Sequence, residues 1–192
     1  MNLESLKKDI TNYLNILYDC KYDINIYKAL KVNNRVINLY SYPFIVILNS
    51  LVETCVVRLN SIIAFGNQKR ISKLVTNCEH NKKYVADDNL DIVLNEINTI
   101  LDKNKEMLNN IKTWRDKNLA HSDAKYFGKV EELFKDNPII NEELISLIDS
   151  LILSIKELYK LFECNGAYDC SAEIEEDLDN LLNTIKKKDL YK

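Results

Sequence analysis

The sequence is poor in the residues that interrupt helices. Its 192 residues include only three glycines and two prolines. Strands need turns, and turns are commonly built from glycine and proline, so this scarcity argues against a sheet-rich fold. The apolar residues instead recur with helical spacing. We therefore predict an all-α fold in one domain over residues 1–192: an antiparallel helical bundle of four long helices plus short peripheral helices.

An excess of positive charge is also missing. Lysine and arginine total 26, aspartate and glutamate total 29, and the formal net charge at pH 7 is −3. This balance excludes a protein-wide basic surface, because binding of nucleic-acid phosphates needs clustered lysine and arginine. A small catalytic cleft needs few cations, so any contact with RNA or DNA would have to be local.

The sequence has no cysteine pattern typical of a metal site or a disulfide framework. Its five cysteines are odd in number and form no Cys-x-x-Cys pair, and the nearest Cys/His pair is Cys78 and His80. The N-terminus is polar and charged, unlike a secretory signal. We expect free thiols, a cytoplasmic location, no metal and no cofactor. Abundant Asn, Ile, Lys and Tyr indicate an AT-rich, bacterial genome.

No apolar run reaches the ~20 residues that a membrane span needs. The most apolar segment is residues 44–65, and Asn49, Glu53, Arg58 and Asn60 interrupt it. A membrane helix is one interpretation; the one we adopt is a buried central helix of a bundle, with no membrane partner. Glu53 and Arg58 then have two interpretations, as functional groups or as ion-pair partners of neighbouring helices.

Apolar spacing and end signals place the helices. The predicted ranges are 3–31, 43–65, 71–78, 88–121, 141–162 and a last helix from 171. The first helix has two interpretations, one continuous helix or a break near Tyr22-Asp23 after which it resumes. Pro43 fits a first helical position, and Ser72 fits a cap. Residues 122–140 are expected to be irregular.

The longest helical pattern ends in an arginine and a histidine. Arg115 lies about 100° beyond Trp114, which places it at the edge of the buried stripe. An arginine grips a phosphate with a fork of donors, and a histidine moves protons near neutral pH. On an ideal helix His121 lies about 240° from Arg115. The two converge only if the helix ends or kinks at 119–121, or if a second subunit supplies the partner.

The same residues have a structural interpretation. A helix that ends in Arg, Lys and His complements its own dipole, whatever the function. Asn118 is three residues from both Arg115 and His121 and could orient either, and Ser122 and Asp123 could fix the histidine tautomer.

The run from Arg115 to Asp123 resembles the signature of the HEPN superfamily, in which four to six residues separate an arginine from a histidine and a polar residue directly follows the arginine. Here five residues separate Arg115 from His121, and Asp116 fills the polar position. The fuller pattern of residues 115–123, Arg-Asp-Lys-x-x-Ala-His-x-Asp, looks like that of the AbiU-type subgroup, named for abortive phage infection. The segments 41–44 and 71–74 are similar to that subgroup as well.

The resemblance implies that two copies form a homodimer with a composite site at their interface. It also implies a metal-independent endoribonuclease, often a toxin or an antiviral effector. Arg115 would bind the scissile phosphate and His121 would act as general acid or base. The expected supporting residues are Asp116, Asn118 and Asp123. The expected RNA contacts are Lys112, Lys117 and Lys125, with Lys103 and Lys105 nearby. The expected partners are single-stranded RNA, a second copy and an antitoxin protein.

A second function remains open from the sequence. The negative net charge and the lack of a strong basic patch also suit a non-catalytic helical interaction module that binds a protein or a nucleotide. Cleavage of RNA in the presence of EDTA separates this module from the enzyme.

Overall fold

The computed structural model describes residues 2–32, 41–63, 70–85, 89–120 and 130–189, and these residues contain helices and no strand. This confirms the predicted all-α bundle. The elements are α1 (Leu3–Val32), α3 (Ser41–Ile63), α4 (Ile71–His80), η2 (Lys82–Tyr84), α5 (Asn89–Lys103), α6 (Lys105–Trp114), η3 (Arg115–Ala120), α7 (Val130–Asp136), α8 (Asn141–Leu161) and α9 (Ser171–Asp189).

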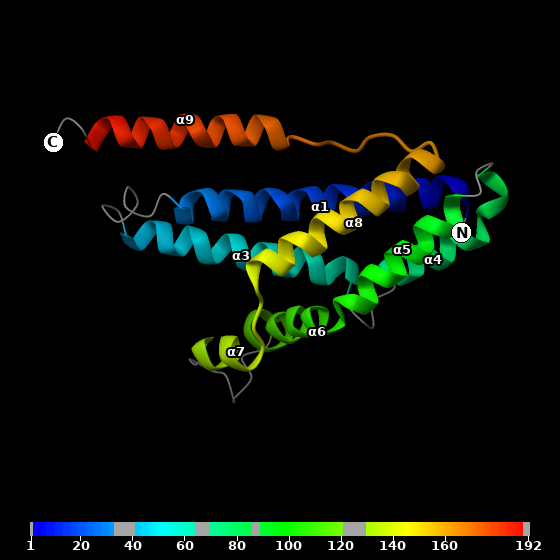
Figure 1. Cartoon of the computed structure of the whole chain (residues 1–192), viewed down its shortest axis with the longest axis horizontal. Coiled ribbons are helices and arrows are strands. Elements are labelled where there is room, and N and C mark those ends of the chain that lie inside the picture. The colour runs from blue at the N-terminus through cyan, green and yellow to red at the C-terminus, as the bar shows by residue number, and fades with distance from the viewer. Residues whose placement is uncertain (1, 33–40, 64–69, 86–88, 121–129, 190–192) are drawn as a thin grey trace.

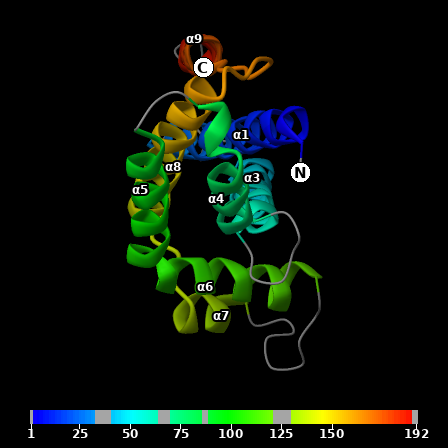
Figure 2. The same cartoon turned by 90° about the vertical axis from the view of Figure 1, so that its right-hand side faces the viewer.

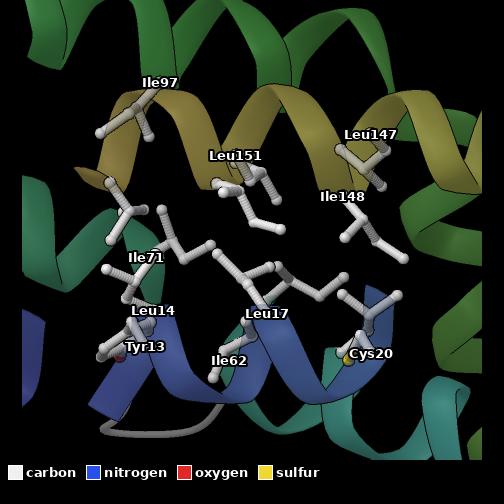
Figure 3. Close-up of a cluster of buried hydrophobic side chains, with 14 of the residues drawn as sticks. Tyr13, Leu14, Leu17, Cys20, Ile62, Ile71, Ile97, Leu147, Ile148 and Leu151 are labelled. Atoms are coloured by element: carbon white, nitrogen blue, oxygen red, sulfur yellow. The ribbon is translucent and has the colours of Figure 1, made fainter. Parts of the chain in front are cut away.

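The core forms where α3 and α8 pack on α1 and α5 packs on α8. Consecutive long helices run in opposite directions, as short connections between neighbours require (Figure 1). The predicted stripes supply the core: Leu14 and Leu17 of α1 face Leu147 and Leu151 of α8 (Figure 3). Burying one such side chain contributes roughly 1.5–3 kcal/mol, so this interface stabilises the bundle.

The first helix is continuous, which excludes the alternative of a break near Tyr22-Asp23. α1 runs without interruption from Leu3 to Val32. Neither glycine nor proline lies in this range, and Tyr22 and Ile24 are both buried. Asp23, which suggested the break, is held instead by Arg58 of α3 through an ion pair of 2.5 Å. Long-range pairing therefore keeps a polar residue inside a helical stripe.

The expectation of a fully buried central helix is wrong for one face of α3. By length and composition alone, the segment Val46–Ile63 could cross a membrane, a test that core helices of soluble proteins also pass. Within the structure, 28% of this segment is buried. Cys55, Leu59 and Ile62 face the core, whereas Val57 is 47% exposed. We call the exposed side the outer α3 face; its residues are Val46, Ile47, Ser50, Glu53 and Val57.

The predicted helix over 88–121 is two helices that meet at Asn104. The chain turns sharply there, so that α6 leaves the direction of α5 (Figure 2). Asn104 has φ −102° and ψ 16°, and its side-chain amide donates to the Ile100 carbonyl at 2.8 Å. Asparagine competes in this way with the helical hydrogen bonds, which explains the break.

Helix ends also differ in detail from the predicted ones. α4 is capped by Arg70, and Ser72 lies inside the helix rather than at its cap. α3 begins at Ser41, so Pro43 lies within its first turn, where a missing N–H is tolerated. The range expected to be irregular contains α7.

The helix α8 ends with a residue other than glycine in the left-handed conformation. Glu163 has φ 50°, and the N–H of Cys164 donates to the Tyr159 carbonyl at 2.9 Å. This is a Schellman ending, in which a glycine commonly takes the left-handed position. Here a glutamate takes it, and Gly166 follows three residues later with φ 80°.

The last helix packs lightly. α9 contributes Leu178 and Leu182 to a small cluster with Leu30 of α1, and Leu48 and Leu51 of α3 border the same cluster. Ile174 reaches the edge of the main core. Figure 1 shows α9 lying along the outer side of α1.

Candidate functional site

The helix that carries the candidate site folds by packing one face. Met107, Leu108, Ile111 and Trp114 recur at helical spacing and are all buried. This face fixes α6 against its neighbours, including α3. Because a residue adds about 100° of rotation, Arg115 falls beside the buried face and not on it.

Two side-chain hydrogen bonds tie α6 to the segment before α8. Trp114 Nε1 donates to the carbonyl of Asn137 at 2.8 Å, and Asn110 Nδ2 donates to the carbonyl of Pro138 at 2.9 Å. The two acceptor carbonyls belong to consecutive residues, and the two donors lie one helical turn apart on α6. α6 is therefore held at two points. The end of α6 is therefore fixed in the fold.

The motif itself begins in a π-helix. Residues Arg115–Ala120 form η3, directly after α6. π-Helical turns are rare, occur mainly as single turns in α-helices and are frequent at functional sites. η3 also contacts α3. The change of helix type occurs at the first motif residue, several residues before 119–121, where an end or kink was one of the two ways for Arg115 and His121 to converge.

Arg115 lies at the surface, as the stripe geometry predicts. Its side chain is 43% exposed, and its Nη1 contacts Asp116 Oδ1 at 2.7 Å. The Asp116 side chain is 33% exposed. A pair this exposed contributes at most about 1 kcal/mol. A guanidinium carries five N–H donors, so a bond through one nitrogen leaves donors for a phosphate.

The structure places only part of the predicted site. Lys112 lies in the last turn of α6 and Lys117 lies in η3, and both side chains are partly exposed. Asn118 also lies in η3, but its side chain is outside what the structure describes. His121, Asp123 and Lys125 lie outside the described residues.

A family model described as AbiU2, of the HEPN type, matches residues 15–181, which is most of the chain. The chain belongs to the AbiU2 family. The predicted resemblance is thereby confirmed, and the match includes Arg115 and every residue of η3. No curated protein and no solved structure matches the chain.

A second arginine of this AbiU2 family chain is structural. Arg58 on α3 pairs with Asp23, whose side chain is 13% exposed, and approaches Asp19 at 3.8 Å. Burial raises the pKa of the Asp23 carboxyl, and Arg58 opposes that rise. Of the two interpretations of Arg58, the ion pair between helices is the one the structure shows.

Asn60 is a residue that the sequence reasoning noted only as an interruption. It is 5% exposed, and its side-chain oxygen has no hydrogen-bond partner among the described residues. It lies about 140° round α3 from Cys55, which contacts α1 at Cys20. Buried acceptors without a partner are costly and need an explanation, such as a catalytic role. Asn60 is therefore a buried polar group to note on α3, the helix that contacts η3.

The remaining ligand-type groups are dispersed. Within the described ranges, no three His, Cys, Asp or Glu side chains gather closely enough to hold a metal ion. All five cysteines are free, and each lies in a described segment. Burial raises the pKa of Cys78 to about 12, so this thiol stays protonated at neutral pH.

Proposed function

We propose that this AbiU2 family protein is a metal-independent endoribonuclease that acts in the bacterial cytoplasm as a toxin or antiviral effector. The observation that carries the proposal is Arg115: an exposed guanidinium at the start of a π-helical turn, in a chain that matches the HEPN-type AbiU2 family. The preceding helix is fixed by packing and by two hydrogen bonds, so the backbone that carries Arg115 has a fixed place in the fold.

The proposed reaction breaks one phosphodiester bond of single-stranded RNA. The 2′-hydroxyl attacks the neighbouring phosphorus and loses its proton, and the 5′-oxygen of the next nucleotide leaves with a proton. His121 transfers one of these protons, as general base or general acid. Arg115 stabilises the charge that grows on the phosphate oxygens. Asp116, Asn118 and Asp123 position these two groups.

The electrostatics of the proposed site come from side chains. Lys112, Lys117 and Lys125 would hold the RNA backbone on either side of the cleaved bond, because each lysine neutralises one phosphate. No metal and no cofactor takes part in the proposed chemistry. Such a local cluster suits a protein whose net charge is negative.

We further propose that two copies assemble the site. The outer α3 face supports this, since it leaves Val46, Ile47 and Val57 exposed on a helix that also contacts η3. A second copy on this face would bury apolar surface beside the motif. An antitoxin protein is a further proposed partner.

RNA cleavage in EDTA tests the chemistry. Wild-type protein should cleave single-stranded RNA, whereas Arg115→Ala and His121→Ala should be folded and inert. His80→Ala is the matched control, because His80 is the other histidine of the sequence and is exposed at the end of α4. Equal cleavage by the wild type and both motif variants would remove these residues from the mechanism.

Sedimentation tests the dimer. Val57→Glu places a charge on the outer α3 face and should yield a folded monomer with little cleavage activity. Ile92→Glu is the control, because Ile92 is 65% exposed on α5 and away from this face. A wild-type protein that stays monomeric while it cleaves RNA would contradict the composite site.

The second candidate is a non-catalytic module that binds a protein or nucleotide partner. One observation favours it: the Arg115 guanidinium is already paired with Asp116 at 2.7 Å. A module of this kind would bind its partner with unchanged affinity in EDTA and would cleave no RNA, in either the wild type or the Asp116→Asn variant.

A further inference from the structure

A hollow of about 450 Å³ lies where the end of α3, the start of α4 and the α5–α6 corner meet. Its polar lining comes from three helices and the residue that caps α4. These residues are Arg70, Ser72, Asn98, Asp102 and Lys105. Its remaining walls are apolar and include Ile71 and Leu108, both buried. The hollow is open to the surface, because Ser72, Asn98 and Lys105 are exposed.

The lining suits a ligand that is part apolar and part anionic. Arg70 and Lys105 are cationic and Asp102 is anionic, so the hollow favours a ligand with a single negative charge over a polyphosphate. The leucine and isoleucine walls accept a flat apolar group. The Asn98 amide and the Asp102 carboxylate can bond the polar edge of that group. One nucleotide unit combines these properties, with a base, a sugar and one phosphate.

The hollow and the candidate site lie at the two ends of one helix. Lys105 is the first residue of α6, and Arg115 directly follows its last. Ten residues at 1.5 Å each place the two positions about 15 Å apart along the axis. A stacked strand rises about 3.4 Å per nucleotide, so about four nucleotides span this distance. A strand cleaved at Arg115 is therefore long enough to reach the hollow.

We propose that the hollow is a subsite for one nucleotide of the single-stranded RNA substrate, about four positions from the cleaved bond. The base lies on the apolar wall with Leu108, and Arg70 and Lys105 hold the adjoining phosphate. This inference rests on the proposed function, since it adds a subsite to the same RNA path. It predicts that longer RNAs bind more tightly than short ones.

Binding and cleavage of RNAs of two lengths test the subsite. The binding probe is a fluorescein-labelled RNA of about ten nucleotides, 2′-O-methylated so that no 2′-hydroxyl can attack. Arg70→Ala and Lys105→Ala should each weaken its binding about tenfold. Each should also reduce the slope of log affinity against log salt by about 0.7, as for one lost phosphate contact on a single strand. Lys73→Ala is the matched control, because Lys73 is exposed next to Ser72 and lies outside the lining.

Cleavage separates the subsite from the catalytic site. Cleavage of an unmodified trinucleotide, too short to reach the hollow, should be the same in wild type, Arg70→Ala and Lys105→Ala. Cleavage of the unmodified long RNA should show a raised KM and an unchanged kcat. Circular dichroism checks that each variant is folded.

The outcomes divide cleanly. If the wild type cleaves RNA but both hollow variants bind the long probe like Lys73→Ala, the subsite is wrong and the proposed function stands. If the wild type cleaves nothing while probe binding still depends on Arg70 and Lys105, the hollow binds RNA and the proposed enzyme is wrong. If adenosine monophosphate binds as tightly as the long probe, the hollow takes a free nucleotide and the substrate subsite is overturned.

Discussion

Arg58 pairs with an aspartate on another helix, whereas Arg115 pairs with the next residue in the chain. The first pair joins α3 to α1 through Asp23, whose side chain is 13% exposed. The second pair joins two side chains at the surface of η3, 43% and 33% exposed. Both contacts are short, at 2.5 Å and 2.7 Å. Distance alone therefore does not distinguish their roles.

Burial and sequence separation do distinguish them. Removing one partner of a half-buried pair strands a charge in a low-dielectric site, which is costly. An exposed pair between neighbours holds nothing together, and water replaces either partner at little cost. Arg58 is therefore committed to the fold, whereas Arg115 is available to exchange Asp116 for a phosphate.

The largest effect is expected from replacing Arg115, the exposed arginine. Arg115→Ala should lower RNA cleavage by about 10²–10³-fold, equivalent to about 3–4 kcal/mol of transition-state stabilisation. The free energy of unfolding should stay within about 0.5 kcal/mol of wild type, as for exposed residues. Single-turnover cleavage and urea denaturation measure the two quantities. Arg115→Lys keeps the charge without the fork and should recover only part of the activity. Loss of stability equal to that of an Arg58 variant would refute the assignment.

The next largest effect is expected from replacing Arg58, the arginine that joins α3 to α1. Arg58→Met should lower the free energy of unfolding by about 2 kcal/mol at pH 7, because the Asp23 carboxylate loses its partner. Burial raises the pKa of Asp23, so the folded variant binds a proton more tightly than the unfolded chain. The stability of the variant is therefore greatest at acidic pH and falls as the pH rises through the folded-state pKa.

Urea denaturation at pH 4 and pH 7 measures this difference. The deficit should be smaller at pH 4, and the double variant Arg58→Met, Asp23→Leu should recover much of the stability at pH 7. A deficit that is the same at both pH values would mean that Asp23 ionisation is not its cause.

A smaller effect is expected from weakening the attachment of α6, the helix that precedes Arg115. Trp114→Phe keeps most of the buried ring but removes the bond from Nε1 to the Asn137 carbonyl. We expect a loss of about 1 kcal/mol in unfolding free energy. We also expect a several-fold lower kcat with an unchanged KM, because the guanidinium is less well positioned. An unchanged kcat would show that this anchor does not position the site.

The smallest effect concerns the partner of Arg115. Asp116→Asn should change the free energy of unfolding by less than about 0.5 kcal/mol. Affinity for a cleavage-resistant RNA should rise a few-fold, because an anion next to the phosphate site is removed. Fluorescence anisotropy measures the affinity, and Asp91→Asn, in an exposed pair with Lys82, is the control. Weaker binding of RNA by Asp116→Asn would contradict the expected loss of repulsion between the carboxylate and the phosphate.

Local sequence patterns predicted most of the fold and the exposure of Arg115. Spacings of three and four residues identify the buried faces of α1 and α8 because those faces depend on rotation within one helix. The same rotation placed Arg115 at the edge of a stripe. The ion pair with Asp116 was not predicted, since it depends on side-chain rotamers.

Features set by distant residues were not predictable in this way. The break at Asn104 depends on one side-chain bond to Ile100, and asparagine is common in helices of this chain without such breaks. The exposure of Val57 depends on which helices cover α3, which periodicity does not encode. Arg70 and Lys105 are far apart in sequence, and only the packing of α4 against the α5–α6 corner brings them to one hollow.

The light packing of α9 has a consequence for how the protein opens. Its described contacts centre on Leu178 and Leu182 in the small cluster, while the main core continues without them. Elements with few buried contacts detach at a free energy below that of global unfolding. Amide protons of α9 should therefore exchange with solvent well before those of α1, and a gently warmed chain would release its last helix while the bundle that carries Arg115 stays closed.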